Sequence, residues 1–384
     1  MENCPLSLSS GHSSLVTYPY LLNNKSMSKT DWLLAAPTSA TNIKADTPLH
    51  HFLVRLMRGE NLSMDEASEF FNAITDDNAN PAQIAGSLVA LAAKGETFEE
   101  LAGMARVMRE KSVKIKSRQK NFIDTAGTGS GQIKTFNVST AASFVIAGAG
   151  LTVAKHGNRA VTSKTGSADV LDKLGVKVSS EPSNAQICLN GTGICFMFAP
   201  KFHPALRRVG DIRRSLGVRT SLNLLGPLSN PAGAPKQIIG VWHRSLVEPM
   251  AQALSLLGTE KAWVIHGGDG LDEITLARET YIAEVSKNRL KTFIVEPETF
   301  GLKRGRVDHL HADSPEESAR IVMEVLQSKR RDEARSLVVM NAAAAIYIGG
   351  LAKDLSHAAR LAEQAIDSGQ AQHKLERLIQ TTNK

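Results

Sequence analysis

From about residue 120 onward, short apolar runs alternate with amphipathic segments of helical length, and this alternation restricts the possible folds more than any other feature. Phe122-Ile123, Leu151–Ala154, Ile194–Phe198 and Ile238–Trp242 are typical of buried strands, and a helical pattern follows each one. Alternating strands and helices build a mostly parallel sheet with helices on its faces. The sequence therefore predicts an α/β domain with a central, mostly parallel sheet flanked by helices.

The residues before this region carry helical patterns only. Leu49, Phe52 and Leu56 recur at helical spacing, and Ser63–Glu66 and Thr97–Glu100 have the form of capping boxes. We therefore expect a compact set of short helices ahead of the α/β region.

The first 45 residues fit neither pattern. They are rich in Ser, Thr and Asn, with few basic residues and no Arg, so a weakly ordered extension is favoured over an organelle transit peptide. Met27 is an alternative start of the chain. The predicted organisation is an extension over 1–45, a small N-terminal helical domain over 46–116 and a larger α/β domain over 117–384.

Composition narrows the class of protein further. A net charge of +7 over 384 residues suits an anionic ligand and keeps nucleic-acid binding open as an alternative. The three cysteines form no CxxC pair, which argues against a zinc site or a disulfide framework and favours a reducing compartment. No apolar run approaches the roughly 18 residues of a membrane span. We expect a cytoplasmic protein without a membrane partner.

The stretch DTAGTGSGQIKTFNVST, residues 124–140, joins a predicted strand to a predicted helix through a Gly-rich turn. Its glycines allow close backbone approach to a ligand, and the N–H groups of such a turn, with the positive end of the next helix, favour an anion such as phosphate. Ile133 stands at the last Gly position of a GxGxxG motif, and the Gly-Lys-Ser/Thr of a Walker P-loop is absent. A turn of this composition without a ligand is the alternative.

Three later stretches also concentrate polar side chains. VAKHGNRAVTSKTGSADVL, 153–171, places cations, amides and hydroxyls after a strand, where open α/β sheets bind ligands. HPALRRVGDIRRSLGVRT, 203–220, is dense in Arg, which suits carboxylate or phosphate contacts, and the Pro/Gly-rich loop 223–233 is able to form a pocket wall. HGGDGLDEIT, 266–275, clusters carboxylates as a Mg²⁺ site would. For each of these three stretches, the alternative is a polar segment that contacts only solvent. The Arg-rich stretch has a further alternative, which is a surface that binds nucleic acid.

Taken together, these stretches resemble the anthranilate phosphoribosyltransferase family. The motifs that carry the resemblance are KTFNVSTAAS, AKHGNRAV, GSADVL, FAPKFHPA, R-x5-RT-x4-LGPLSNPA and DGLDEIT, and they lie within residues 46–384. The resemblance implies transfer of the phosphoribosyl group of 5-phosphoribosyl 1-pyrophosphate (PRPP) to anthranilate in tryptophan biosynthesis. It gives N-(5-phosphoribosyl)anthranilate and pyrophosphate, and the family's enzymes are Mg²⁺-dependent homodimers.

The resemblance also implies a role for each matching residue. Anthranilate would contact Gly127, Asn158 and Arg213, with the Arg facing its carboxylate. Mg²⁺ would be held by Ser139, Asp272 and Glu273, and Lys155 and Arg213 are the expected catalytic residues. PRPP would be bound by the turn, the helix start and the loop after the second strand: Gly127, Ser130, Gly131, Thr135, Asn137, Val138, Ser139, Thr140, Lys155, His156, Gly157, Asn158, Arg159, Ala160, Val161, Thr162, Ser163 and Ser167.

The chain departs from the family pattern in one place. The family's turn reads Gly-Thr-Gly-Gly-Asp, whereas this chain has Gly127-Thr128-Gly129-Ser130-Gly131, so a carboxylate expected near pyrophosphate or its metal is missing. We expect altered PRPP or Mg²⁺ affinity rather than lost binding, because backbone N–H groups carry much of the contact.

Two other functions stay open from the sequence. One is a transferase or phosphorylase of the same fold with another acceptor. The other is a nucleic-acid-binding relative with little activity, which the +7 charge motivates. Lys155 and the Asp272-Glu273 pair argue against the second, because a protein that only binds nucleic acid does not need a Mg²⁺ site.

Overall fold

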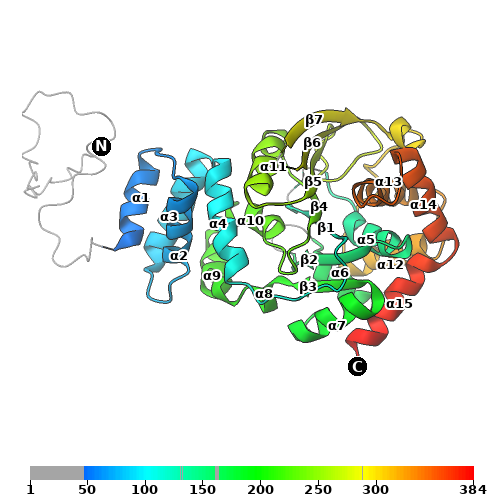
Figure 1. Ribbon diagram of the computed structural model, residues 1–384, viewed down its shortest axis with the longest axis horizontal. Helices are drawn as coiled ribbons and strands as arrows, with labels where there is room; N and C mark the ends of the chain where they lie inside the picture. The colour runs from blue at the N-terminus through cyan, green and yellow to red at the C-terminus, as the bar shows by residue number, and fades with distance from the viewer. Residues whose placement is uncertain (1–46, 130, 132, 161–163, 288) are drawn as a thin grey trace, which may run out of the picture. The chain divides into compact units, whose positions relative to one another are not determined.

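The computed structural model describes residues 47–384 apart from 130, 132, 161–163 and 288 (Figure 1). The described residues all belong to one compact unit. The expected extension over 1–45 lies outside the described residues. It stays a prediction, as do the exact boundaries of the two expected domains.

Four short helices open the described part of the chain, as the sequence predicts. Ser63 and Glu66 exchange both hydrogen bonds of a capping box, and Thr97 and Glu100 do the same before the fourth helix. The helices are α1 (Pro48–Met57), α2 (Met64–Ile74), α3 (Pro81–Lys94) and α4 (Phe98–Glu110). The expected N-terminal helical domain is therefore confirmed as a helical bundle.

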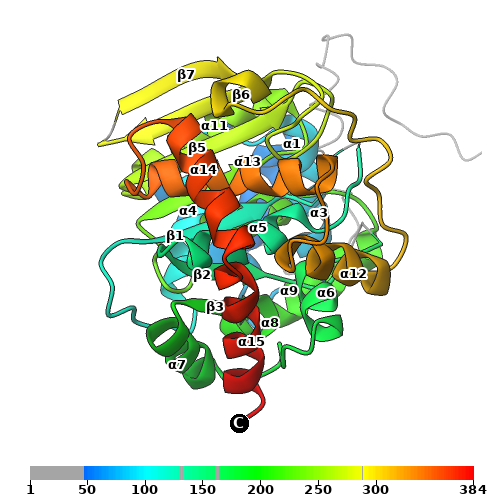
Figure 2. The ribbon, with the colours of Figure 1, turned by 90° about the vertical axis from the view of Figure 1, so that its right-hand side faces the viewer.

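A seven-stranded sheet forms the centre of the remaining chain (Figure 2). Its strand order is β3-β2-β1-β4-β5-β6-β7. The strands from β3 to β5 are parallel, whereas β5 with β6 and β6 with β7 pair antiparallel. The strands are β1 (Phe122–Gly127), β2 (Thr152–Gly157), β3 (Ile194–Phe198), β4 (Lys236–Gly240), β5 (Lys261–Gly267), β6 (Thr280–Ser286) and β7 (Arg289–Val295). The predicted mostly parallel sheet is confirmed.

Helices cover both faces of this sheet. Trp263 and Ile265 of β5 belong to one apolar core, and Ala262 and Val264 of the same strand belong to the other, as the alternation of side chains along a strand requires. The helices after α4 are α5 (Val138–Gly148), α6 (Ser167–Lys173), α7 (Pro182–Thr192), α8 (Ala199–Phe202), α9 (Arg207–Leu216), α10 (Leu222–Leu228), α11 (Val247–Leu256), α12 (Pro315–Leu326), α13 (Glu333–Ile348), α14 (Leu355–Asp367) and α15 (Gln370–Thr382).

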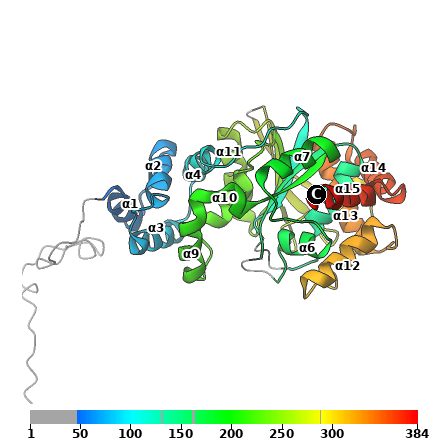
Figure 3. The ribbon, with the colours of Figure 1, turned by 90° about the horizontal axis from the view of Figure 1, so that it is seen from below.

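Each core belongs to a different set of helices. The first lies under α5 and α12 to α15, and the second lies under α4, α10 and α11 and continues into α1 to α3 (Figure 3). Because the second core is continuous, the helical bundle packs on the sheet domain. None of the helices in the described residues is both long and apolar enough to span a bilayer.

One local expectation is wrong. The stretch 223–233 is not simply a loop, because Leu222–Leu228 forms α10 with Pro227 inside it. Pro227 lacks the N–H that a longer helix would need, and the helix ends one residue later, so little hydrogen bonding is lost. The helix buries Leu224, Leu225 and Leu228 in the second core and turns its other side to the cleft described next.

Candidate active site

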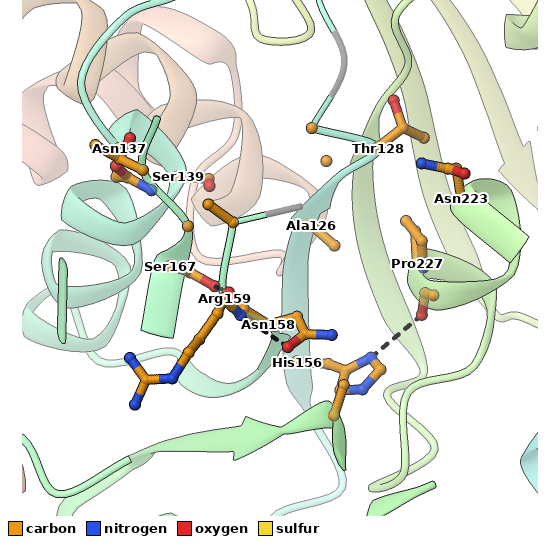
Figure 4. A pocket seen from close by; sticks show the side chains of 18 of the residues that line it. Ala126, Thr128, Asn137, Ser139, His156, Asn158, Arg159, Ser167, Asn223 and Pro227 are labelled. Carbon is orange, nitrogen blue, oxygen red and sulfur yellow. Dashed lines mark hydrogen bonds between the residues drawn. The ribbon is translucent and has the colours of Figure 1, made fainter. Parts of the chain in front are cut away.

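The predicted stretches meet in one cleft at the carboxyl ends of the parallel strands (Figure 4). The cleft has a volume of about 860 Å³, which is large enough for two small substrates. The turn after β1, the start of α5 and the loop after β2 line one end. Helices α9 and α10 line the other end, and the loop after β5 lies against the turn after β1.

The turn after β1 holds its shape through backbone contacts. Gly129 has φ +71°, the left-handed region that glycine occupies without strain, and its N–H donates to Asp272 Oδ2 at 3.1 Å. A Cβ atom placed on Gly131 would lie 2.8 Å from Asp272 Oδ1. Asp272 therefore packs directly against the turn, and it can do so because residue 131 has no side chain.

Helix α5 begins at this turn, and its first residues face the cleft. Asn137 occupies the N-cap position yet makes no capping hydrogen bond with its own helix. The Ser139 N–H donates to Glu273 Oε1 at 3.2 Å, so the backbone donor that the sequence led us to expect free is occupied by a carboxylate. The positive end of the helix still favours negative charge at this point.

Lys155 is a buried cation in the floor of the cleft. Its side chain reaches up from β2, and its Nζ donates to the Thr125 carbonyl oxygen at 2.6 Å and to Ser139 Oγ at 3.4 Å. Burial lowers the pKa of Lys155, while the nearby carboxylates of Asp124 and Glu273 act in the opposite direction. The lysine therefore lies in the floor of the cleft with only two hydrogen-bond partners among the described residues, where an anionic ligand can approach it.

Asp124 holds the floor of the cleft together from below. Its two oxygens accept from the His156 N–H at 3.1 Å and from Asn230 Nδ2 at 2.7 Å, and Asn230 also donates to the Ala154 carbonyl oxygen at 2.8 Å. Burial raises the pKa of Asp124 to about 6. This carboxylate fixes the start of the loop after β2 and does not line the cleft.

Two adjacent carboxylates from the loop after β5 complete this end. Both Asp272 and Glu273 are half-buried in the wall of the cleft, and desolvation raises the pKa of each. For Glu273 the pKa rises to about 8, because the charge of Asp272 adds to the effect of burial. A pair of buried acids whose charges repel each other is stabilised by any cation that enters between or beside them.

The opposite end of the cleft carries a different chemistry. Arg213 on α9 is half-buried, and its guanidinium has no hydrogen-bond partner among the described residues. Burial lowers the pKa of Arg213, with Arg214 adding to the effect. Asn158 lines the cleft from the loop after β2, with its side-chain oxygen accepting from the Arg159 N–H at 2.8 Å.

Two buried histidines lie between the ends of the cleft. The His156 ring, 5.0 Å from the His203 ring, holds its Nδ1 3.2 Å from the Gly226 carbonyl oxygen (Figure 4). Burial lowers the pKa of His156 to about 4 and that of His203 to about 3. Both imidazoles are therefore neutral at pH 7 and add no charge to the cleft.

Arg159 is a predicted site residue whose side chain has another partner. Its guanidinium donates to Asp169 at 2.9 Å and to Asp172 at 2.6 Å, both on α6. Figure 4 shows this side chain directed away from Asn158 and Ser167. Only the rest of Arg159 is therefore placed to contact a ligand, and the guanidinium instead fixes the loop to α6.

Most predicted site residues within the described part of the chain line the cleft. Gly131 and Thr140 do not, because Gly131 is covered by Asp272 and Thr140 is buried behind the start of α5. Ser130, Val161, Thr162 and Ser163 lie outside the described residues. The residues that line the cleft as predicted are Gly127, Thr135, Asn137, Val138, Ser139, Lys155, His156, Gly157, Asn158, Arg159, Ala160, Ser167, Arg213, Asp272 and Glu273.

Sequence reasoning missed one wall of the cleft. The segment before α12 lines the cleft with His311, Ala312 and Asp313. Asp313 forms an ion pair with Lys164 from the loop after β2. No motif marks this segment, and it lies well over a hundred residues after the Gly-rich turn. Only the fold brings it to the cleft.

Comparison with known proteins agrees with this architecture. The family model described as "Glycosyl transferase family, helical bundle domain" matches residues 50–112, and the one described as "Glycosyl transferase family, a/b domain" matches residues 119–372. An anthranilate phosphoribosyltransferase from Desulfosudis oleivorans is 46% identical over 330 residues, which cover 86% of this chain and 97% of the relative.

Solved structures give the same result. The crystal structure of anthranilate phosphoribosyltransferase from Thermus thermophilus superposes with a TM-score of 0.82 at 38% identity, covering 87% of this chain and 99% of that one. The Saccharomyces cerevisiae enzyme in complex with PRPP and Mg gives 0.79 at 27% identity, covering 87% and 98%. Its complex with 4-fluoroanthranilate gives 0.77 at 26%, with the same coverage. The chain thus belongs to the anthranilate phosphoribosyltransferase family, glycosyltransferases of tryptophan biosynthesis.

Proposed function

We propose that the cleft holds PRPP at its Gly-rich end and anthranilate at its Arg213 end, and that the transfer takes place between them. The observation that carries this proposal is the different chemistry of the two ends of one cleft. The Gly-rich end combines the positive end of α5 with Lys155 and two carboxylates, whereas α9 lines the other end with arginines, of which Arg213 is half-buried. A phosphorylated sugar and a small aromatic acid match these two ends in charge and in size.

The PRPP end is suited to several phosphate oxygens. Asn137 and Ser139 offer an amide and a hydroxyl at the start of α5, and Lys155 lies beside Ser139. Charge-assisted hydrogen bonds of this kind are about twice as strong as neutral ones. These polar groups support the proposal that the turn after β1 and the start of α5 bind PRPP.

Mg²⁺ fits the same end of the cleft. Asp272, Glu273 and the Ser139 hydroxyl are hard oxygen donors that line the same end of the cleft, and burial raises the pKa of both acids. The described residues contain no group of three or more His, Cys, Asp or Glu that could hold a metal by themselves. This donor set suits Mg²⁺, which is typically bound through one or two carboxylates together with substrate phosphates. When bound, Mg²⁺ would neutralise charge on the pyrophosphate group.

The anthranilate end is suited to a planar carboxylate. Arg213 offers a fork of N–H donors, and Asn158 lines the same cleft from the loop after β2. The neutral rings of His156 and His203 add no charge that would compete with this pairing. The yeast relative's complex with 4-fluoroanthranilate supports an acceptor of this class.

The chemical step is a displacement at the anomeric carbon of PRPP. The nitrogen lone pair of anthranilate forms the new C–N bond, the bond from that carbon to pyrophosphate breaks, and the electron pair leaves with pyrophosphate. The nitrogen then loses a proton to water. The aryl amine is neutral and nucleophilic, so no strong base is needed, and the cleft acts by positioning both substrates and by Lys155 stabilising the departing charge.

The proposal is tested with the fluorescence of anthranilate, which is lost when the product forms in the presence of PRPP and Mg²⁺. Arg213→Ala should raise the KM for anthranilate by about 10- to 100-fold, the range for a lost hydrogen bond to a charged group, and leave the KM for PRPP nearly unchanged. Lys155→Ala should instead lower kcat/KM for PRPP. Arg208→Ala, on the same helix with its guanidinium bonded to the Asp77 and Ala79 carbonyls, is the control. An unchanged KM for anthranilate in Arg213→Ala would contradict the assignment.

We also propose that two copies of the chain form a homodimer and that nucleic acid has no role in the reaction. The N-terminal helices α1 and α3 carry exposed apolar side chains, which makes them the favoured interface.

If the wild-type protein showed no turnover but bound DNA in a salt-sensitive way, the nucleic-acid-binding alternative would hold instead. A cytoplasmic location stays a prediction.

A further inference from the structure

The start of α5 is held from outside by the segment 310–318, and this contact carries an inference about PRPP recognition. The Phe136 N–H donates to the Leu310 carbonyl oxygen at 2.9 Å. One residue later, the Asn137 N–H donates to Ser318 Oγ at 3.0 Å. Ser318 lies in the first turns of α12, is fully buried, and belongs to none of the predicted site residues.

The contact between Ser318 and Asn137 is reciprocal. Ser318 Oγ accepts from the Asn137 backbone and donates its own proton to Asn137 Oδ1 at 2.9 Å. An asparagine side chain has one acceptor end and one donor end. Because Ser318 occupies the oxygen, the amide nitrogen of Asn137 is the end left over, and among the described residues it has no hydrogen-bond partner. Asn137 itself lines the cleft.

This arrangement runs against the local preference of the chain. Asn is among the best N-cap residues, because its side-chain oxygen accepts from N–H groups in the first turn of its own helix. Asn137 sits at the N-cap of α5 and makes no such bond. Its oxygen is turned to Ser318 on α12 instead, 181 residues further along the chain.

We propose that Ser318 is a positioning residue that turns the amide nitrogen of Asn137 toward a phosphate oxygen of PRPP. Without the Ser318 hydroxyl, the Asn137 side chain is free to cap α5, which presents its oxygen to the helix and withdraws the donor from the cleft. An oxygen facing the phosphate would repel it, so the orientation of this amide decides whether Asn137 helps or hinders binding. The inference rests on the proposed placement of PRPP phosphate at the start of α5.

A double-mutant cycle on PRPP binding tests this inference. The dissociation constant for PRPP is measured by calorimetry with Mg²⁺ present, and KM and kcat are measured alongside. Ser318→Ala should weaken PRPP binding by about tenfold, as for one lost hydrogen bond to a charged group, with kcat and the KM for anthranilate within about twofold of wild type. Asn137→Ala should weaken PRPP binding to a similar extent. In the Asn137→Ala background, Ser318→Ala should add almost nothing.

Two further variants separate positioning from a general loss of packing. Ser68→Ala removes another buried serine hydroxyl that is hydrogen-bonded to backbone, on α2, and should lower the melting temperature without changing PRPP affinity. Ser318→Cys keeps a weaker donor at the same place, so it should give an intermediate PRPP affinity and serves if Ser318→Ala does not fold.

The outcomes distinguish this inference from the proposed function. If Asn137→Ala weakens PRPP binding but Ser318→Ala and Ser318→Cys do not, the inference about Ser318 is overturned and the phosphate placement stands. If Ser318→Ala weakens binding equally with and without Asn137, Ser318 acts by another route and the inference is again overturned. If Asn137→Ala leaves PRPP affinity unchanged, the phosphate placement at α5 fails, and the inference fails with it.

Discussion

At the scale of single residues, Gly131 shows how one missing side chain changes a site. The family's turn pattern carries an Asp where this chain has Gly131, and here Asp272 fills the space that such a side chain would take. Glu273 comes from the same loop as Asp272, so these two carboxylates at the Gly-rich end of the cleft both belong to the loop after β5. The sequence exposed this difference, but it could not show that Asp272 would be the neighbour.

The consequence is a prediction for Gly131→Asp. The new Cβ atom would lie 2.8 Å from Asp272 Oδ1, so the Asp272 side chain has to shift, and the substitution adds a third carboxylate to the pair. We expect half-maximal activity at a lower Mg²⁺ concentration and a changed KM for PRPP, because added negative charge attracts the cation. The increase in melting temperature on adding Mg²⁺ with PRPP gives a readout that is independent of turnover.

Gly131→Asn is the matched control, because it has the same shape without the charge. An effect shared by both variants would mean that crowding of Asp272, and not charge, is responsible. If neither the Mg²⁺ dependence nor the KM for PRPP moved in Gly131→Asp, the absent carboxylate would have no functional role.

The residue scale also shows the limits of sequence reasoning. Lys155, Asp272 and Glu273 were predictable as cleft residues, because each stands in a polar motif at or after the carboxyl end of a strand. The ion pairs of Arg159 were not, since a cation in a polar loop has the same pattern whether it faces a ligand or a helix. The hydrogen bond of Ser318 was not predictable from the sequence, because a serine in the first turns of a helix is common and its partner lies in another element.

At the scale of elements, helix ends were predicted most reliably. The capping boxes at α2 and α4 depend on residues three positions apart, so the sequence alone contains the whole interaction. Glu66 also bonds to Arg55 of α1, with Nη1 2.6 Å from Oε1, which ties two helices of the bundle together. The helix α10 was missed because Pro and Gly in NLLGPLSNPAG favour a loop, while burial of its leucines overrides that preference.

The Glu66 contacts predict a dependence of stability on pH. Bonds from Arg55 and from the Ser63 backbone lower the pKa of Glu66 to about 2, below its ordinary value of 4.5. A carboxyl whose pKa is lowered by folding stabilises the protein above the ordinary value and loses that contribution as the pH falls toward 2. At pH 7, Glu66→Gln should reduce the free energy of unfolding by about 1 kcal/mol, a modest value because the side chain is part-exposed.

The measurement is urea unfolding of wild type and Glu66→Gln at several pH values. The difference in unfolding free energy should shrink between pH 4.5 and pH 2. Glu69→Gln changes an exposed glutamate on the same helix that forms no ion pair with any described residue, and it should show no such trend. A difference that stayed constant across this range would show that the cap geometry matters and the charge does not.

At the scale of the whole molecule, the mostly parallel sheet with helices on its faces follows from the alternation of patterns in the sequence, whereas the order of the strands does not. The packing of the helical bundle on the sheet does not follow either, because it depends on apolar side chains of α4, α10 and α11 that meet only after folding. Apolar side chains also remain exposed on α1 and α3. Met57 is 46% exposed and Val89 44% exposed, and the two helices pack against each other.

These residues predict where two copies of the chain associate. If the proposed homodimer forms through α1 and α3, the double variant Met57→Glu with Val89→Glu should be monomeric, because charge cannot be buried in such an interface without a partner. Sedimentation velocity measures the assembly state directly. Ile187→Glu changes an even more exposed apolar residue, 62% exposed on α7, and should leave the dimer intact. Dimers that survive the double variant would place the interface elsewhere.

The loop after β5 has one more consequence for the molecule. In this structure, Asp272 accepts from the Gly129 N–H and Glu273 accepts from the Ser139 N–H, so the two acids occupy backbone donors at the Gly-rich end of the cleft. If phosphate binds these amides as proposed, a carboxylate oxygen has to release them first. Loading the cleft would then be an exchange of partners, in which the oxygens released by the backbone become free at the same moment for a cation that arrives with the phosphate.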